Sequence, residues 1–432
     1  MSLPKQALYG NKIQSSYARN YQSKIAPQNG RDYSLGETII INVPTASNIV
    51  MSGADTLIKF KINARNATAG PLIAALDRGG AAGVIQRLRV FHGSSLLSDM
   101  DNYGNLVASL MSLQNDPMAL ITKFQVLQGT DLQRGVSMNA AAGATKSIEF
   151  SFPLLSILSL TQNYVPLFGM TGSPMRIEIQ LVNTIPQFMV STGVYSADPA
   201  LKTVTDVELI GNFMEMNDNA MNIIKSASGD VVQWSVSDFK NYASNAVLSG
   251  ASDTQLSIPI PAKFNSLKSL LHTYREHSSG DATFYPHESC RFALKEYTTR
   301  IGSQVLPSTA PNSVAEFYAE LLRSVGSVGD LNSQCSIDSD SYDAARPEAF
   351  TALTILSKSF FTGMDLESYS NSDIHSIYQG LNTSTHDIFF QPTFGPQTEA
   401  DGTAVNRNLR VDTYAMFDAL ILLENGVANV TY

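Results

Sequence analysis

The sequence predicts a mostly β protein built from two similar halves in tandem. Three observations lead to this prediction: several stretches alternate apolar and polar residues, clusters of Gly, Pro, Asn and Ser separate them, and short motifs recur about 209 residues apart. The chain has 432 residues and is 44% hydrophobic, which is enough for a large core and excludes wholesale disorder. At about 150 residues per domain, this length corresponds to two or three domains.

The predicted strands are half-buried and antiparallel. Every second residue is apolar in 146–152 and in 175–181, and the same alternation appears in 58–62 and 256–260. Such a period places the apolar side chains on one face of a strand and the polar ones on the other. Many short strands separated by turn residues are typical of sandwiches and barrels.

Two helices are predicted within this β pattern. The first covers 102–113, and the second covers 312–325, where Ser313 and Glu316 have the spacing of a capping box and Gly326 is placed to end the helix. We interpret their apolar stripes as core packing rather than ligand sites. The stripes consist of Leu106, Leu110 and Leu113 in the first helix, and Val314, Phe317, Tyr318, Leu321 and Val325 in the second.

The two halves of the chain resemble each other in short matches that keep the same order. Residues 93–97 match 302–306 at an offset of 209, 106–110 match 317–321 at 211, and 213–215 match 422–424 at 209. Three matches at nearly one offset indicate two similarly folded domains of about 200 residues, each the size of one sandwich. The boundary is expected within 218–230.

The first 35 residues have a different composition from the rest. They contain no acidic residue before Asp32, and Tyr9, Tyr17 and Tyr21 are interleaved with five basic residues, which are Lys5, Lys12, Arg19, Lys24 and Arg31. With no strong period, this segment is predicted to be an extended basic arm. Such an arm contacts nucleic acid, an anionic membrane or an acidic neighbour. The alternative is a solvated tail without a partner.

Composition also bears on partners and on the cellular compartment. The chain has 29 Lys and Arg against 38 Asp and Glu, and this acidic balance argues against nucleic-acid binding over the whole surface. Only 16% of residues are charged, against about 25% in typical domains, which suits a surface covered by copies of the same protein. Cys290 and Cys335 are expected to be unpaired thiols in a reducing compartment, with a single disulfide as the alternative.

No targeting or membrane-spanning segment is apparent in the sequence. No apolar stretch approaches the roughly 20 residues that span a bilayer, and the N-terminal residues lack the apolar core of a signal peptide. The sequence therefore predicts a soluble protein made in a cytosol-like compartment.

The sequence contains no catalytic, metal or cofactor motif. Six histidines are scattered, and His287 with Cys290 would need two further ligands to hold a metal. Residues 79–83 are rich in glycine but lack the Lys-Ser/Thr pair of a phosphate-binding loop, so they are interpreted as a turn before a strand. Trp234 is expected in the core rather than on a sugar-binding platform. We therefore predict no enzyme activity, no cofactor and no small-molecule substrate.

Several short sequence segments, taken in order, resemble those of a known family. In the first half they are 80–90, 92–97, 152–155 and 164–167. In the second half they are 297–302, 363–369, 380–383 and a strand pattern over 414–427. Together they resemble the double jelly-roll major capsid proteins of icosahedral DNA viruses, the lineage of the adenovirus hexon. The likeness is nearest to polinton-like viruses and virophages. It covers most of 35–432 and leaves out the basic arm.

This resemblance implies a fold and a structural function. It implies two tandem eight-stranded jelly rolls, 35–218 and 231–432, each with a short helix in a loop, joined by a linker 219–230 and preceded by the arm 1–34. Homotrimers would form pseudo-hexagonal capsomers of an icosahedral capsid, together with penton and minor capsid proteins. The virion would be assembled in the host cytoplasm or nucleus. The arm, through the five basic residues from Lys5 to Arg31, would contact neighbouring subunits, an internal membrane or the genome on the inner surface.

Two other functions remain open from the sequence. The first is a secreted tandem β-sandwich that binds carbohydrate or hydrolyses glycans, which would need an export route and usually more exposed aromatic residues. The second is a cytosolic scaffold that assembles without being viral. Self-assembly into closed shells separates the capsid protein from both.

Overall fold

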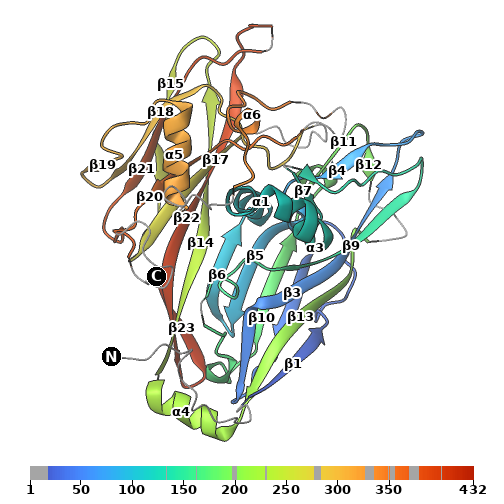
Figure 1. The fold of residues 1–432 in the computed structure, drawn as a ribbon, viewed down its shortest axis with the longest axis vertical. Coiled ribbons are helices and arrows are strands. Elements are labelled where there is room, and N and C mark those ends of the chain that lie inside the picture. The colour runs from blue at the N-terminus through green and yellow to red at the C-terminus, as the bar shows by residue number, and fades with distance from the viewer. Residues whose placement is uncertain are drawn as a thin grey trace, which may run out of the picture.

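Strands dominate both halves of the chain, and in each half they form two main sheets (Figure 1). The computed structural model describes residues 18–132, 134–161, 163–196, 202–228, 231–276, 284–325, 335–348, 350, 356–368, 379–399 and 401–432. All pairings between the named strands are antiparallel, which agrees with the half-buried alternation of the sequence.

The first half contains eight main strands in two sheets. One sheet has the order β1-β13-β3 with β9 also paired to β3, and the other has the order β2-β10-β5-β6. In chain order these strands are β1 (Ala18–Ile25), β2 (Thr38–Val43), β3 (Ile49–Asn66), β5 (Ile85–His92), β6 (Ser95–Asp101), β9 (Thr145–Pro153), β10 (Met175–Leu181) and β13 (Val204–Met216). Short strands extend the loops: β4 (Ala74–Leu76), β7 (Thr130–Asp131), β8 (Arg134–Gly135), β11 (Met189–Ser191) and β12 (Tyr195–Ser196).

The second half repeats this arrangement. One sheet has the order β14-β22-β17-β20 with β23 also paired to β22, and the other has the order β21-β18-β19 with β15 and β16 paired to β21. The strands are β14 (Val231–Leu248), β15 (Thr254–Gln255), β16 (Ile258–Ile260), β17 (Leu267–Glu276), β18 (Leu294–Ile301), β19 (Gln304–Leu306), β20 (Phe361–Asp365), β21 (Ile388–Phe394), β22 (Arg407–Glu424) and β23 (Val427–Thr431).

Both halves follow one strand order. If the main strands of each half are counted from one to eight, with β15 and β16 together as the second strand of the second half, the sheets read 1-8-3-6 and 2-7-4-5 in both. This is the order of a jelly roll, in which two Greek keys fold into a double sheet. The chain is therefore a double jelly roll, and the predicted fold class is confirmed.

The recurring motifs occupy equivalent positions in the two jelly rolls. Residues 93–97 and 302–306 include the turns of the hairpins β5–β6 and β18–β19. Gly93 and Gly302 have φ of +58° and +59°, the left-handed region that glycine adopts without steric cost. The offset of 209 residues therefore reflects the same hairpin turn formed twice.

The helices agree with the prediction in position but differ in detail. They are α1 (Tyr103–Gln114), α2 (Pro117–Ala119), α3 (Gln125–Gln128), α4 (Asp218–Ser228), α5 (Val314–Ser324) and α6 (Ser339–Tyr342), with a π-helical turn η3 (Leu120–Phe124) and short 3₁₀ turns η2 (Gly80–Val84), η4 (Leu167–Gly169) and η5 (Ile185–Gln187). At α5 the Ser313 hydroxyl accepts from the Glu316 N–H as predicted, but the Glu316 carboxylate accepts from Asn312 N rather than from Ser313 N. Gly326 lies outside the described residues.

The structure corrects the prediction for the basic arm. Residues 18–25, which the prediction placed in an extended arm spanning 1–34, form β1 and pair with β13 along their whole length. Tyr21 stacks on Phe213 of β13 at a centroid distance of 5.6 Å, so this part of the segment belongs to the first jelly roll. Residues 1–17 lie outside the described residues. The predicted linker 219–230 overlaps α4, which Figure 1 shows at the lower end of the molecule.

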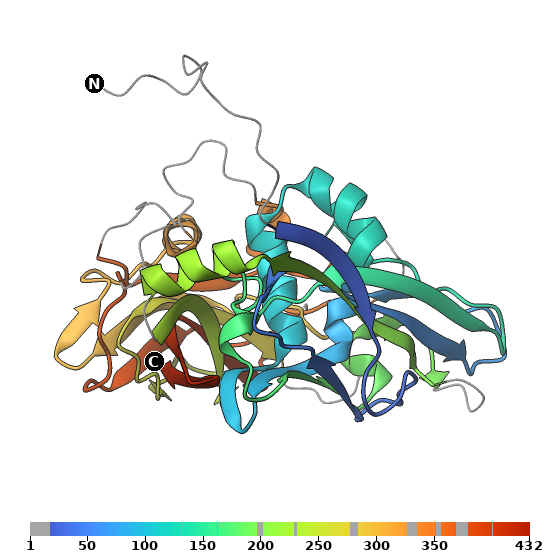
Figure 2. The same cartoon turned by 90° about the horizontal axis from the view of Figure 1, so that it is seen from below.

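The two jelly rolls stand side by side, and most helices lie on one face (Figures 1 and 2). One continuous cluster of buried apolar side chains extends through both rolls and includes Trp234, which is 1% exposed as expected of a core residue. Both cysteines are free. Among the described residues, no helix has the length and apolarity needed to cross a bilayer.

Candidate functional site

The histidines do not form a reactive cluster within the described parts of the chain. His272 is buried, its ring lies 3.8 Å from that of Phe390, and its Nδ1 lies 2.9 Å from the hydroxyl of Thr413. Burial lowers the pKa of His272 to about 3, so the ring is neutral and acts as a core side chain. The described ranges contain no group of three or more His, Cys, Asp or Glu side chains placed to hold a metal. His277 and His375 lie outside them.

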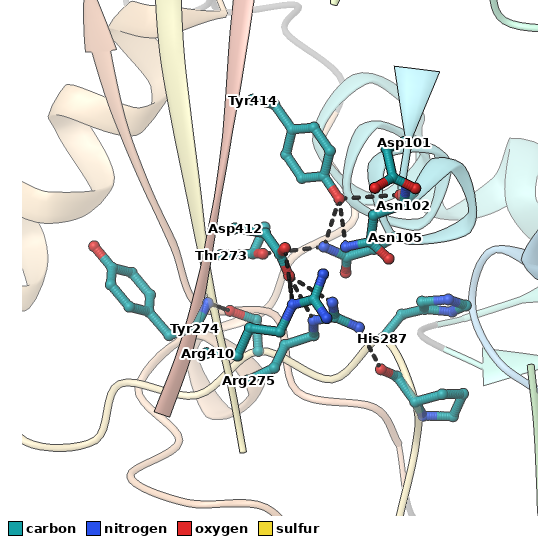
Figure 3. A network of polar contacts seen from close by, with 12 residues as sticks. Asp101, Asn102, Asn105, Thr273, Tyr274, Arg275, His287, Arg410, Asp412 and Tyr414 are labelled. Atoms are coloured by element: carbon teal, nitrogen blue, oxygen red, sulfur yellow. Dashed lines mark hydrogen bonds and ion pairs between the residues drawn. The ribbon is translucent and has the colours of Figure 1, made fainter. Parts of the chain in front are cut away.

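A network of polar contacts lies where the two jelly rolls meet (Figure 3). Tyr414 of β22 points at the N-terminal turn of α1, and its hydroxyl accepts from the amides of Asn102 and Asn105 at 3.0 and 2.9 Å. The same hydroxyl donates to the carbonyl of Asn102, and Asn105 also donates to Thr273 of β17. Burial raises the pKa of Tyr414 well above its ordinary value, so it remains a neutral donor at the junction.

A buried ion cluster adjoins this network. Asp412 is fully buried and accepts from the guanidinium groups of Arg275 and Arg410, each with an Nε–oxygen distance of 3.0 Å (Figure 3). Burial opposes ionisation, but the two guanidinium groups hold the pKa of Asp412 below its ordinary value. Arg275 also donates to the carbonyl of Pro286. The cluster therefore fixes the loop that carries His287 to the β17–β22 pair.

Two residues of the first jelly roll insert into the second. Arg78 is 2% exposed and donates to the carbonyl of Lys358 at 2.8 Å, to the Ser359 hydroxyl at 2.6 Å and to the carbonyl of His287 at 2.5 Å. Its neighbour Asp77 accepts from the His287 N–H at 2.6 Å. Burial disfavours the Asp77 carboxylate, but His287 and Arg78 hold its pKa below the ordinary value. These hydrogen bonds tie the loop before η2 to the second roll.

The junction also contains a cavity of about 620 Å³. Its wall is polar and includes Gln86, Asn102, Thr184, Arg275, Glu288 and Arg410. Glu288 is 4% exposed, and its Oε2 has no hydrogen-bond partner among the described residues. Burial raises its pKa to about 8, which keeps the carboxyl largely protonated at neutral pH.

A second carboxyl with a raised pKa lies at another point of the junction. Asp238 of β14 is buried and accepts from the hydroxyl of Ser98 in β6 at 3.1 Å and from the Phe239 N–H at 2.9 Å. Burial raises its pKa to about 7. The chemistry of the junction is therefore that of a structural contact, in which buried charges are paired and two less well paired carboxyls keep their protons to a higher pH.

The predicted inner-surface residues are only partly within the described chain. Arg19, Lys24 and Arg31 are exposed, and the last two lie 3.8 and 3.7 Å from Glu208 of β13. Lys5 and Lys12 lie outside the described residues. Their contact with an inner partner stays a prediction.

Sequence reasoning missed the junction residues. Arg78, Asp77 and Asp412 show no motif or spacing in the sequence, and the structure joins positions more than 200 residues apart. The only sequence signal for the junction is the set of polar residues in the predicted first helix. Asn105, Ser109 and Ser112 interrupt an otherwise apolar segment, and all three are buried.

Comparison with solved structures finds the same fold in viral proteins. VP54 of the virus PBCV-1, fitted into a cryo-EM reconstruction of the virophage Sputnik, aligns with a TM-score of 0.65 and 11% identity, over 98% of this chain and 100% of that one. The Faustovirus major capsid protein aligns with a TM-score of 0.60 and 9% identity over 97% and 92%. The mavirus major capsid protein aligns with a TM-score of 0.52 and 12% identity over 100% and 96%.

These comparisons establish the fold of the whole chain as a double jelly roll. The sequence itself matches no protein-family model and no curated protein. At 9–12% identity the likeness does not extend to individual side chains, so the junction residues described above are features of this chain.

Proposed function

We propose that this chain is a structural major capsid protein. Three copies form a pseudo-hexagonal capsomer from six jelly rolls, and the capsomers tile an icosahedral shell. The observation that carries the proposal is the repeated strand order in tandem, which matches solved major capsid proteins over nearly the full length of both chains.

The junction supports a geometric function. A capsomer subunit must keep its two jelly rolls at one angle, since the pseudo-hexagonal outline depends on their equivalence. Buried pairs such as Asp77–His287 and Arg275–Asp412 have directional geometry and hold a single arrangement. In this proposal the chain carries no catalytic site, and the low density of charge suits broad lateral contacts with few buried charges.

The basic N-terminal segment supports a further part of the proposal. We place it on the inner surface of the shell, in contact with neighbouring subunits, an internal membrane or the genome, while penton and minor capsid proteins complete the virion. Because Lys24 and Arg31 already lie near Glu208, the residues left for a partner are chiefly Lys5, Lys12 and Arg19. If neutral variants of these three residues still form closed shells with unchanged salt resistance, this part of the proposal is wrong.

Electron microscopy of the expressed protein tests the capsid function. The proposal predicts three-fold symmetric particles with a pseudo-hexagonal outline, and closed shells when the minor proteins are supplied. Isolated two-lobed particles at every concentration would contradict it. Glycan arrays run on the same preparation test the carbohydrate-binding alternative, for which we expect no retained glycan.

A further inference from the structure

An apolar helical segment protrudes from the first jelly roll. The α2, η3 and α3 helices follow one another without a break and form one helical segment over 117–128. Its Met118 and Val126 side chains are 59% and 79% exposed and lie eight residues apart, about two helical turns. Lys123 lies between them and is the only charged residue of the segment. Two large apolar side chains exposed on one helical segment make it a candidate for a contact surface, provided that a complementary apolar site exists.

A groove with the complementary character lies on the second jelly roll. It has a volume of about 780 Å³ between α5 and α6, and its apolar wall is formed by Val314, Ala315, Tyr318, Ile337 and Tyr342. Tyr318 and Tyr342 meet edge to face at 4.8 Å and form its floor. Val314 and Tyr318, which the sequence assigned to a core stripe, are only half-buried because they line this groove.

The rim of the groove is acidic. Asp338, Asp340 and Asp343 are all exposed and lie along its edge. Asp338 also caps α6 through the Ser341 N–H, and Asp343 pairs with Arg291 at 2.8 Å. The groove is thus apolar in its centre and negative at its edge, whereas the protruding segment is apolar with a single positive charge.

The segment and the groove lie on the same face of the molecule. Figure 1 shows α3, α5 and α6 in front of the sheets, and Figure 2 shows them along one side of the two jelly rolls. We propose that the 117–128 segment of one copy docks into the α5–α6 groove of a second copy, with Met118 and Val126 in the groove and Lys123 at its acidic rim. This inference rests on the proposed function and names the contact that closes the capsomer.

The two surfaces differ, and this has a consequence for symmetry. A contact between unlike patches is heterologous, so each copy offers its segment to the next and its groove to the previous one. Such a contact forms a closed ring when the rotation between copies is an integral fraction of a full turn. Three copies joined in this way bring the helical faces together around the axis.

A charge exchange tests the contact in the full-length protein. Lys123→Glu places a negative charge opposite the aspartates, and Asp340→Lys places a positive charge opposite Lys123. Each single variant should therefore raise the dissociation constant of the trimer by about tenfold or more. The double variant Lys123→Glu with Asp340→Lys should recover most of the affinity. Both side chains are exposed, so the monomer fold is expected to persist, and circular dichroism checks this.

A matched apolar pair separates the docking contact from general surface effects. Val126→Asp should dissociate the trimer, whereas Val247→Asp, at a β14 side chain that is 61% exposed, should leave it intact. If the wild type is a trimer and neither Val126→Asp nor the charge-exchange variants weaken it, this inference is wrong but the proposed capsid function is unaffected. A wild-type monomer at all concentrations would overturn the proposed function itself. Recovery in the double variant is the result that supports the docking contact.

Discussion

At the scale of single residues, Arg78 connects the two jelly rolls through three hydrogen bonds. All three acceptors belong to the second roll, while Arg78 itself belongs to the first. Its guanidinium also lies 4.8 Å from the ring centre of Phe361, so the charge is held by both polar and aromatic partners. A residue with such contacts cannot be replaced by another cation of different shape, because a lysine cannot reproduce the planar fork.

Removal of this side chain should destabilise the protein strongly. Arg78→Met removes the positive charge beside the buried Asp77 carboxylate and removes the donor to the His287 carbonyl. We expect a loss of about 3–5 kcal/mol in the free energy of unfolding. Urea unfolding followed by Trp234 fluorescence measures it, with the exposed Arg19→Met as the control. A loss below about 1 kcal/mol would contradict the assignment.

The two junction carboxyls predict a pH dependence. Burial raises the pKa of Glu288 to about 8 and that of Asp238 to about 7, from ordinary values of 4.5 and 3.8. The folded state therefore holds these protons more tightly than the unfolded state. Their contribution is fully present below the ordinary values and is lost as the pH rises through 7 and 8. The melting temperature should fall between pH 6 and pH 8.5.

Glu288→Gln separates this effect from other titrations. The amide can still accept from the Lys358 N–H, as the Glu288 Oε1 does at 3.2 Å, but it cannot ionise. The variant should show a shallower fall in melting temperature above pH 7 than the wild type. If the melting temperatures of the variant and the wild type fall equally with pH across this range, ionisation of Glu288 does not cause the loss of stability above pH 7.

At the scale of elements, α1 is the helix that both jelly rolls enclose. All but its last residue are buried, and Gly104 faces the η2 turn so closely that an added Cβ would lie 2.9 Å from the Gly83 Cα and 3.0 Å from the His287 ring. Glycine at this helix position costs stability relative to alanine in isolation. Its presence is explained by the close approach of helix and turn.

Gly104→Ala should therefore destabilise in spite of its better helix propensity. We expect a net loss of about 1–3 kcal/mol, the usual range for overpacking in a closely packed site. Gly70→Ala is the matched control because nothing lies within 4 Å of a Cβ added at Gly70, and it should be neutral. Differential scanning calorimetry of both variants decides the point, and an unchanged or higher melting temperature for Gly104→Ala would contradict the packing argument.

The sequence predicted those elements whose environment is local. β10 was predicted to the residue, since one buried face leaves a period of two. β1 was not predicted, because a strand at the edge of a sheet with exposed Arg19 and Lys24 has little apolar alternation. The enclosure of α1 on all sides was not predicted either, because the second jelly roll that covers Asn105 is distant in sequence.

At the scale of the whole molecule, the two jelly rolls are alike in strand order but different in surface. The first roll exposes Met118 and Val126 on a protruding helical segment, and the second exposes a groove with an acidic rim. Unlike surfaces allow a heterologous contact between copies, which closes into a ring when the rotation between copies is an integral fraction of a full turn. The sequence could show the duplication but not this asymmetry, which arises from loops that differ between the halves.

We expect this chain to act as an oligomeric building block. Its solution mass, measured by light scattering at low and moderate salt, tests this expectation. One chain has a mass of 46.8 kDa, so we expect a species of about 140 kDa, three times that value, which persists on dilution. A single species near the mass of one chain at every concentration would contradict it.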